Sequence, residues 1–301
     1  MYDHETIELN RRSWDTISSR YQASTRISTR DVHYGPLAPG ERELGLLGDV
    51  AGKRVIEIGC GGGQNSIALA RWGAECVGVD PSSAQLSHAR QLARDSGVEV
   101  AFAVGVAEDL SGFPTESFDL ALSSFAFGYV TNLPRAYAEV WRVLRGPDPT
   151  LGHPGGLFVF CLTHPWFRAV GRHLAGDPDM PAVLDYAGWP CVDEWDWSYD
   201  DGTSVRMREY LHTVAGLVNG LIEAGFVLER LVEQSIADVA HWPPAQLDRL
   251  PYVDELDPNG QEYQVMRKLP PTLILRARKT AARYSEPARA PRTGAEGIQA
   301  L

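Results

Sequence analysis

The segment from Arg54 to Gln64, R-V-I-E-I-G-C-G-G-G-Q, constrains the possible fold of this chain more than any other. Its apolar residues Val55, Ile56 and Ile58 are typical of a strand that is buried on both faces of a parallel sheet. Glycine occupies four of the next five positions, which lets the backbone turn sharply and approach a ligand closely. A helical pattern begins at Gln64. Strand, glycine turn and helix predict half of a nucleotide-binding crevice at the carboxyl ends of a doubly wound sheet.

The charge beside this turn limits which nucleotide could bind. Glu57 lies two residues before Gly59, and a carboxylate there would repel a pyrophosphate resting on the helix amino terminus. Gln64 occupies the final glycine position of a dinucleotide fingerprint, and the chain contains no phosphate-loop sequence. These residues suit a cationic ligand, and they disfavour the alternative of a nicotinamide-dependent oxidoreductase.

The sequence V-I-E-I-G-C-G-G-G resembles the first motif of class I S-adenosylmethionine-dependent methyltransferases of the type 11 group. The resemblance implies an α/β fold, with a Rossmann-like, doubly wound, seven-stranded sheet whose last strand is antiparallel. It implies S-adenosyl-L-methionine as cofactor and S-adenosyl-L-homocysteine as product. In this family the residues that match Glu57, Gly59 and Gly61 hold the methionine part of the cofactor.

A second strand is predicted over residues 75–80, and it ends in an acid. Asp80 stands 21 positions after Gly59, which places its carboxylate at the end of the neighbouring strand, where it can accept both ribose hydroxyls. Pro81 follows it and belongs to the same predicted cofactor site. The alternative is that Asp80 caps the helix that starts near Ser82 and Ser83.

Two further motifs extend the resemblance. A strand is predicted over 98–104, and Val106 follows it where relatives often have the acid that binds the adenine amino group. We therefore assign the adenine contact to the backbone of Ala107 and the side chain of Glu108. The segment 118–125 resembles the fourth motif, whose strand end faces the methyl group. Its Ser123 is assigned to the cofactor, and Phe125 and Phe127 are expected to line the substrate. The segment lacks the N-P-P-Y sequence of methyltransferases that act on nucleobase amines.

The fifth predicted strand, residues 156–163, is followed by His164. A lone histidine is often a structural residue, but the end of this strand points at the predicted crevice. We therefore weigh two roles for His164: a structural one, and that of a catalytic base assisted by a hydrogen bond from Tyr21.

Residues 1–40 are predicted to form an N-terminal helical arm, with an amphipathic helix over 5–24 that carries Trp14 and Tyr21. The arm could simply pack on the core, or it could close over the site as a lid. In the second case the candidate site residues of the arm are Trp14, Tyr21, His33 and Tyr34. We also expect the protein to form a homo-oligomer through this arm.

The methyltransferase domain is predicted over 41–280, with cover insertions at 164–208 and 234–269. The first insertion holds four of the eight tryptophans, and either forms a solvent-facing hairpin or closes over the substrate with Trp166 and Tyr199. A helix over 209–224 and strands over 225–232 and 271–278 match the closing hairpin of the family sheet. Residues 281–301 are predicted to be disordered.

Composition restricts the partners of this 301-residue chain. Its formal net charge of −11 argues against nucleic acid and against an anionic membrane surface. The chain has neither a signal peptide pattern nor an apolar run of membrane-spanning length, so we expect a cytoplasmic protein. Its four cysteines lack metal-ligand spacing, and no metal is predicted.

The predicted activity is therefore methyl transfer to a lipophilic small molecule. The chain is similar to bacterial methyltransferases of secondary metabolism, including the teleocidin-type enzymes that methylate a prenyl group on an indole alkaloid. Such C-methylation forms a carbocation, which aromatic faces stabilise. N- or O-methylation of an amino sugar or an aromatic scaffold is the alternative that the residues leave open.

Overall fold

The computed structural model describes residues 3–25, 27–35, 38–171, 183–234, 236 and 259–281, and the statements below concern these residues. The predicted tail over 281–301 lies outside the described residues from 282 onward. Residues 172–182 of the first predicted cover also lie outside them, as do residues 235 and 237–258 of the second.

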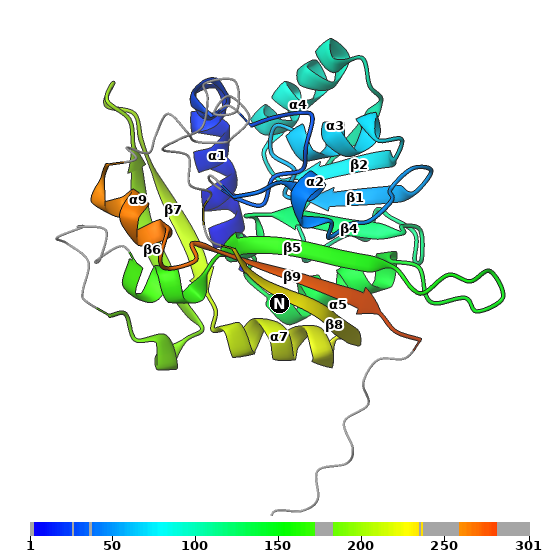
Figure 1. Cartoon of the computed structure of the whole chain (residues 1–301). Helices are drawn as coiled ribbons and strands as arrows, with labels where there is room; N and C mark the ends of the chain where they lie inside the picture. The colour runs from blue at the N-terminus through cyan, green and yellow to red at the C-terminus, as the bar shows by residue number, and fades with distance from the viewer. Residues whose placement is uncertain are drawn as a thin grey trace, which may run out of the picture.

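Seven strands form one mixed sheet in the order β3-β2-β1-β4-β5-β9-β8 (Figure 1). The strands from β3 to β5 are parallel, whereas β9 runs antiparallel to both β5 and β8. This arrangement confirms the predicted α/β class and the antiparallel last strand. The strand bounds are β1 Arg54–Ile58, β2 Glu75–Asp80, β3 Val100–Val104, β4 Leu120–Ser124, β5 Leu157–Thr163, β8 Phe226–Gln234 and β9 Thr272–Lys279.

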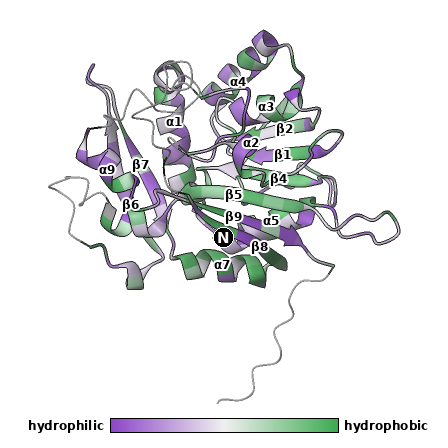
Figure 2. Cartoon of the chain, in the orientation of Figure 1, coloured by the Kyte–Doolittle hydropathy of each residue, from purple (hydrophilic) through white to green (hydrophobic). Residues whose placement is uncertain are grey.

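The central strands are buried on both faces, as their apolar runs predict. In β1, Val55 belongs to one hydrophobic core, whereas Ile56 and Ile58 belong to the core on the opposite face. In β5, Val159 and Phe158 are divided in the same way, because successive side chains of a strand point to opposite faces. Figure 2 accordingly shows hydrophobic residues along β5 and β4.

Helices cover the two faces of the sheet (Figure 1). α5 (Leu133–Val143) and α7 (Val214–Glu223) contribute to the core that contains Phe158. α3 (Gln64–Arg71) and the residues after α2 (Glu41–Leu44) contribute to the other core. α4 (Ser83–Ser96) packs on α3, β2 and β3. The remaining short elements are η1 Phe127–Tyr129, η2 Phe167–Gly171, η3 Tyr186–Gly188 and α9 Gln261–Met266.

A two-stranded hairpin, β6 (Cys191–Ser198) and β7 (Ser204–Leu211), stands apart from the main sheet. The prediction of a helix over 209–224 was wrong at its start, because residues 209–211 pair with 191–193 of β6. The helix begins only after Thr213, whose side chain accepts a hydrogen bond from the Gly216 amide. The sequence did not reveal the pairing partner, so the strand end was assigned to the helix that follows.

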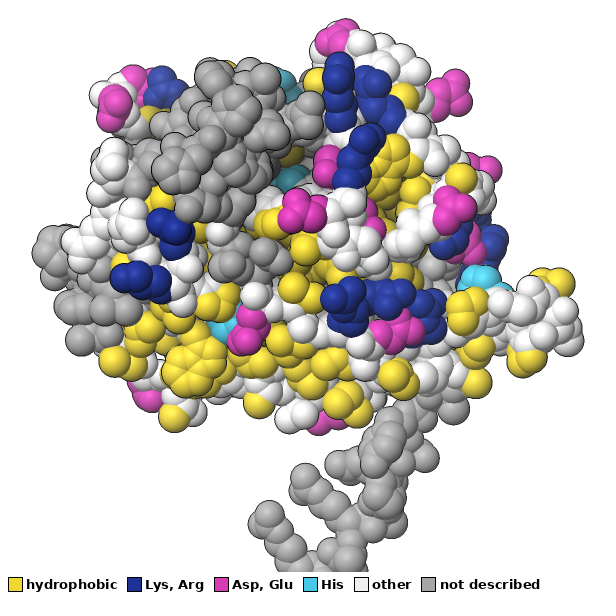
Figure 3. Space-filling view, in the orientation of Figure 1, with side chains coloured by type: hydrophobic (Ala, Val, Ile, Leu, Met, Phe, Trp, Pro, Cys, Tyr) yellow, Lys and Arg dark blue, Asp and Glu magenta, His cyan; other side chains and the backbone are white. Residues whose placement is uncertain are grey.

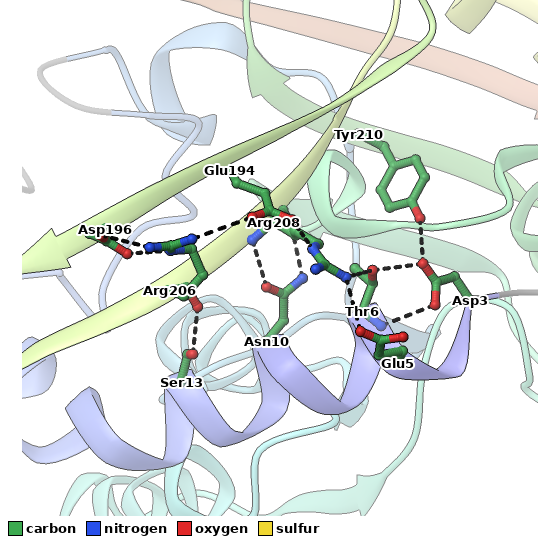
Figure 4. Close-up of polar contacts among 10 residues, drawn as sticks. All are labelled: Asp3, Glu5, Thr6, Asn10, Ser13, Glu194, Asp196, Arg206, Arg208 and Tyr210. Atoms are coloured by element: carbon green, nitrogen blue, oxygen red, sulfur yellow. Dashed lines mark hydrogen bonds and ion pairs between the residues drawn. The ribbon is translucent and has the colours of Figure 1, made fainter.

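The N-terminal helix α1 (His4–Ser24) lies along β7 (Figure 4). Asn10 binds the backbone of Arg208 twice: its Nδ2 donates to the carbonyl (2.9 Å), and its Oδ1 accepts from the amide (2.9 Å). Ser13 Oγ donates to the Arg206 carbonyl (2.6 Å), and Tyr210 Oη donates to the Asp3 carboxylate (3.0 Å). α1 therefore satisfies backbone groups at the edge of β7 that a neighbouring strand would otherwise bind.

The visible surface carries charges of both signs. On the face drawn in Figure 3, Lys and Arg side chains lie beside Asp and Glu side chains. None of the described helices is long and apolar enough to cross a membrane.

Phe127 lies in the core, contrary to the expectation that it contacts substrate. Its side chain is fully buried, and its ring lies 4.8 Å from that of Phe160 and 5.8 Å from that of Tyr137, between centroids. Phe127 is the first residue of the short helix η1, and its ring lies in the core that α5 covers. An aromatic residue just after a strand end can point either way, and only packing decides which.

We expect Phe127→Ala to lower the free energy of unfolding by about 3–5 kcal/mol, because the truncation leaves a cavity among packed rings. Trp166→Ala is the matched control, since Trp166 is 49% exposed and should contribute much less. Urea unfolding followed by circular dichroism measures both changes. A loss below about 1 kcal/mol for Phe127→Ala would contradict the core assignment.

Candidate functional site

The glycine turn joins β1 to α3 with its backbone in the left-handed region. Gly59 has φ of 72° and Gly61 has φ of 49°, conformations that L side chains rarely adopt. A Cβ atom on Gly59 would lie 2.1 Å from the Cβ of Ala126, so the turn packs against the loop after β4. A Cβ atom on Gly61 would meet no atom within 4 Å, so this side of the turn leaves room for a ligand.

Glu57 lies beneath the turn and is almost completely buried, at 3% exposure. Its Oε2 accepts hydrogen bonds from the amide (2.9 Å) and the hydroxyl of Ser66, in the first turns of α3. Burial outweighs these bonds and raises the pKa of Glu57 to about 7. The protein therefore compensates the charge of this carboxylate poorly.

Asp80 lies beside the turn at the end of β2. Its Oδ2 accepts a hydrogen bond from the Gly61 amide (2.9 Å), and its Oδ1 accepts one from the Ser82 amide (2.9 Å). Burial raises the pKa of Asp80 to about 6. The side chain that caps α4 is that of Ser82, which accepts from the Gln85 amide, so Asp80 is not the helix cap.

A cavity of about 170 Å³ lies over the turn, at the carboxyl ends of the parallel strands. We call it the first cavity. Nearly all the residues that the sequence assigned to the cofactor line it: Glu57, Gly59, Gly61, Asp80, Pro81, Ala107 and Glu108. Ser123 does not line it; its side chain is fully buried in β4, and the next residue, Ser124, faces the cavity instead.

Glu108 lines the first cavity, but one of its carboxylate oxygens is already engaged. Glu108 Oε1 accepts hydrogen bonds from the Thr131 amide (2.7 Å) and hydroxyl (3.0 Å). It thereby holds the loop between η1 and α5. The motif comparison did not anticipate this role, because residue 131 is 23 positions further along the chain.

Polar side chains from α1 and from the loop after it also line the first cavity, and among them sequence reasoning missed Gln22. Gln22 donates to Gln85 Oε1 (2.8 Å) and accepts from Gln64 Nε2 (2.5 Å), so α1 spans the two helices beside the cavity. Asn65 Oδ1 accepts from the His33 amide (3.0 Å). No motif marks Gln22, because its role arises from contacts between distant parts of the chain.

A second cavity, of about 380 Å³, adjoins the first. Trp14, Tyr21, Phe125 and Tyr129 line both cavities. The other residues of the second cavity come mainly from the end of β5, from η2 and from the hairpin: Leu162, Thr163, Pro165, Arg168, Trp189, Trp197, Glu209, Tyr210, Leu211 and His212, with Gly128, Glu262 and Met266. The predicted N-terminal arm and the predicted cover thus both contribute walls to one chamber.

Four aromatic rings meet at the junction of the two cavities, and we call them the four-ring cluster: Trp14, Tyr21, Tyr129 and Trp197. The Trp14 ring lies edge-on to those of Tyr21 (5.2 Å), Tyr129 (6.3 Å) and Trp197 (5.7 Å), between centroids. Tyr21 and Trp197 also meet edge-on, at 5.7 Å. Such edge-to-face contacts fix the orientations of the rings relative to one another.

Phe125 lines both cavities with an unusual backbone. Its φ of 58° lies in the left-handed region, which costs a non-glycine residue on the order of 1–3 kcal/mol. The Phe125 amide donates to the Cys161 carbonyl (2.9 Å), which anchors this conformation to β5. The position predicted from the fourth motif is thus where the structure stores backbone strain.

The polar groups of the second cavity are centred on Glu209. Its Oε2 lies 3.1 Å from an Arg168 nitrogen, and its carboxylate also accepts a hydrogen bond from Tyr129. Arg168 forms a second ion pair with Asp193. Burial, and then the charge of Glu209, raise the pKa of Tyr129 well above its usual range, so its phenol stays neutral.

His164 lies in neither cavity, contrary to the role of base considered for it. It is fully buried, its Nε2 pairs with Glu233 Oε1 (3.1 Å), and its Nδ1 accepts from the Trp166 amide (3.0 Å). Burial lowers the pKa of His164. Both ring nitrogens are therefore bonded away from Tyr21, and His164 ties the end of β5 to β8 and to the following turn.

Trp166 and Tyr199 also lie outside the linings of both cavities. Trp166 is half exposed and stacks on Tyr186, with ring centroids 4.8 Å apart. Tyr199 stacks on Trp197 (6.1 Å), and the Arg20 guanidinium lies over the Tyr199 ring, 4.8 Å from its centroid. Ring contacts connect both to residues that line the second cavity, Trp189 and Trp197, and direct contact of either with substrate stays a prediction.

His212 is the histidine that the structure does place in the second cavity. Its Nε2 is buried and has no hydrogen-bond partner among the described residues. Burial lowers the pKa of His212 to about 4, so the ring is neutral at physiological pH. Sequence reasoning missed it because it lies just beyond β7, whose end was assigned to a helix.

Comparison with known proteins supports the class that the sequence motifs imply, the S-adenosylmethionine-dependent methyltransferases. Residues 56–160 match a family model described as a methyltransferase domain. A structure of an S-adenosylmethionine-dependent methyltransferase from Mesorhizobium loti is 26% identical, with a TM-score of 0.55 over 79% of this chain and 96% of that one. The fold and the matched segment define the class: the chain is an S-adenosylmethionine-dependent methyltransferase with the class I fold.

Two curated relatives illustrate the range of similarity. A protein of Haemophilus influenzae without an assigned function is 26% identical over 251 residues, which cover 78% of this chain and 85% of the relative. A ubiquinone biosynthesis O-methyltransferase of Agrobacterium fabrum is 39% identical over 106 residues, covering 35% of this chain and 39% of the relative. The similarity to that enzyme is thus confined to less than half of its length.

We expect the free energy of unfolding of the ligand-free protein to fall between pH 4.5 and 7.5, because Glu57 and Asp80 ionise at higher pH in the folded state than in the unfolded one. Raising the pKa of Glu57 from 4.5 to about 7 corresponds to about 3 kcal/mol. Below pH 4.5 the group is protonated in both states, so the penalty vanishes.

Glu57→Gln should flatten this pH dependence, and Glu75→Gln, at an exposed position of β2, should leave it unchanged. Urea unfolding at several pH values measures the effect. Identical curves for the wild type and Glu57→Gln would show that the buried carboxylate is not penalised.

Proposed function

We propose that this chain transfers the methyl group of S-adenosyl-L-methionine to a lipophilic small molecule bound in the second cavity. The observation that carries the proposal is the shared wall: the first cavity lies over the glycine turn, and the four residues common to both cavities lie between it and an aromatic-lined chamber. A donor and an acceptor could thus meet at the four-ring cluster.

The first cavity fits the cofactor in shape and in charge. The free space at Gly61 can admit a ligand against bare backbone. The buried Glu57 carboxylate, with its raised pKa, would be stabilised by the cationic amino group of the methionine part. Asn65 also lines this cavity, and its side chain donates a hydrogen bond to Glu57, which keeps that carboxylate beside the turn.

We assign the remaining cofactor contacts to the residues that line this cavity. Asp80 has two carboxylate oxygens beside Gly61 and would accept the ribose hydroxyls. The backbone of Ala107, with the part of Glu108 that faces the cavity, would hold the adenine. Ser123 is left out of the set, because its side chain is enclosed in β4.

Bound S-adenosyl-L-methionine supplies an electrophilic methyl group on a sulfonium. The chain contributes position and exclusion of water: Phe125 and the four-ring cluster enclose the point where donor and acceptor meet. Holding two reactants in near-attack geometry can supply several kcal/mol of the barrier, on the order of 7–11 in the best cases. α1 completes this enclosure, because Asp15 accepts from the Ser82 hydroxyl (2.7 Å) and from the Ala84 amide (3.1 Å) at the start of α4.

The acceptor atom follows from the chemistry of the second cavity. C-methylation of a prenyl group on an indole alkaloid needs a base, and His212 Nε2 is a candidate inside the cavity, where His164 is not. N- or O-methylation of an amino sugar or an aromatic scaffold needs a nucleophile held against the same rings. The charge of the second cavity separates these alternatives.

We expect Gly61→Ala to weaken binding of S-adenosyl-L-homocysteine by about tenfold or more, because the added methyl group enters the space that the ligand would fill. Gly52→Ala is a matched control: Gly52 also has a positive φ, 71°, and open space around its Cβ position, but it lies at the other end of β1. Isothermal titration calorimetry measures both affinities. Equal losses in the two variants would show that backbone strain alone is responsible.

We expect Trp197→Leu to reduce methyl transfer from labelled S-adenosyl-L-methionine by tenfold or more, roughly the effect of a misplaced acceptor. The affinity for S-adenosyl-L-homocysteine should change little, since Trp197 lines only the second cavity. The assay uses a panel of lipophilic amines, phenols and prenylated indoles as acceptors. Wild-type turnover in the variant would remove the second cavity as the acceptor site.

A further inference from the structure

The second cavity combines aromatic walls with an excess of acidic groups. Its described lining holds one guanidinium, Arg168, and two carboxylates, Glu209 and Glu262, which gives a net charge of −1. His212 adds no charge near neutral pH, because burial keeps its ring neutral. Glu262 is exposed, but Glu209 is only 17% exposed, and a cavity that served only a neutral lipophilic molecule would gain nothing from such a partly buried carboxylate, which is costly to desolvate.

The positive charge of Arg168 is already balanced. Its guanidinium is 11% exposed and contacts two carboxylates, Asp193 and Glu209. One of these, Glu209, also accepts the hydrogen bond from Tyr129, a member of the four-ring cluster. Glu209 therefore places a negative charge beside the aromatic rings of the cavity. The ion pair with Arg168 fixes the position of its carboxylate.

The four-ring cluster offers faces that attract a cation. Trp14, Tyr21, Tyr129 and Trp197 come together from α1, η1 and β6, and all four line the second cavity. Trp and Tyr faces attract ammonium groups through their quadrupoles, most strongly where water is excluded. Several rings together with a carboxylate form the arrangement that recognises alkylated ammonium ions in proteins.

We propose that the second cavity binds its acceptor as an organic cation, a lipophilic amine whose ammonium group lies between the four-ring cluster and Glu209. This inference rests on the proposed function and narrows it to N-methylation. The ammonium gives one proton to solvent, and the freed nitrogen lone pair attacks the methyl carbon. The C–S bond breaks with its electron pair left on sulfur, and the new N–C bond returns the positive charge to nitrogen, against the same rings.

The test compares two ligands that have the same shape but differ in charge. Benzyltrimethylammonium and its neutral carbon isostere, neopentylbenzene, are titrated into the full chain saturated with S-adenosyl-L-homocysteine, with tryptophan fluorescence as the readout. The nitrogen of the first ligand and the matching carbon of the second already carry four substituents, so neither can accept a methyl group. The measurement therefore reports binding alone. We expect the cation to bind about tenfold more tightly than the isostere, or better.

Two variants locate the effect. Glu209→Gln should weaken binding of the cation by about tenfold and leave the affinity for the isostere unchanged. Trp197→Leu should also weaken binding of the cation, although Glu209 is still present. Glu223→Gln is the matched control, because it removes one negative charge from an exposed position of α7. The affinity for S-adenosyl-L-homocysteine reports whether each variant is folded.

Each outcome decides between the two proposals. Equal affinities for the cation and the isostere, or a Glu209→Gln variant that binds the cation normally, would overturn the amine assignment and leave methyl transfer to a lipophilic molecule standing. Failure of both ligands to bind a chain that retains S-adenosyl-L-homocysteine would overturn the second cavity as an acceptor site, and the amine assignment with it.

Discussion

The glycine turn depends on two buried carboxylates that hold it from different sides. Glu57 binds the first turns of α3 from below, through the amide and hydroxyl of Ser66, and Asp80 binds the Gly61 amide from the neighbouring strand. Burial raises the pKa of both groups, so the protein bears an electrostatic cost at the point where a cationic ligand would relieve it. The two carboxylates thereby keep the turn in a conformation suited to its ligand. Their burial lowers the free energy of unfolding, and a bound cation would restore part of that loss.

α1 connects this turn to the chamber beside it. One end of the helix binds the backbone of β7 through Asn10 and Ser13, and the other end reaches the first cavity through Gln22. The same helix contributes Trp14 and Tyr21 to the junction of the two cavities. A single element therefore shapes both cavities, which explains why the buried face of α1 is largely polar: it bonds to backbone edges and to loop side chains rather than to an apolar core.

Much of the fold could be predicted from sequence because its signals are local. The apolar run before the glycines, the acid that ends β2 and the apolar strand β5 each identify a buried parallel strand, and their order predicts the sheet. The start of α7 could not be found in this way. Residues 209–211 carry a pattern that is compatible with either state, and their pairing with β6 depends on a partner that no local signal identifies. His164 was misjudged for a related reason, since the end of a strand can face the crevice or the packing beneath it.

The sequence by itself determined the cofactor half of this protein: which residues surround the glycine turn, and that their charge suits a cation rather than a pyrophosphate. Contacts within one strand–turn–helix unit are set by neighbours in the chain, so a motif carries them. Only the tertiary structure decided the acceptor half. Trp14, Tyr129, Trp197 and Glu209 are scattered along the chain, and they meet because α1 docks on the edge of β7 beside the end of the sheet. Long-range packing of this kind leaves no regular spacing in a sequence, because it depends on how separate elements come together.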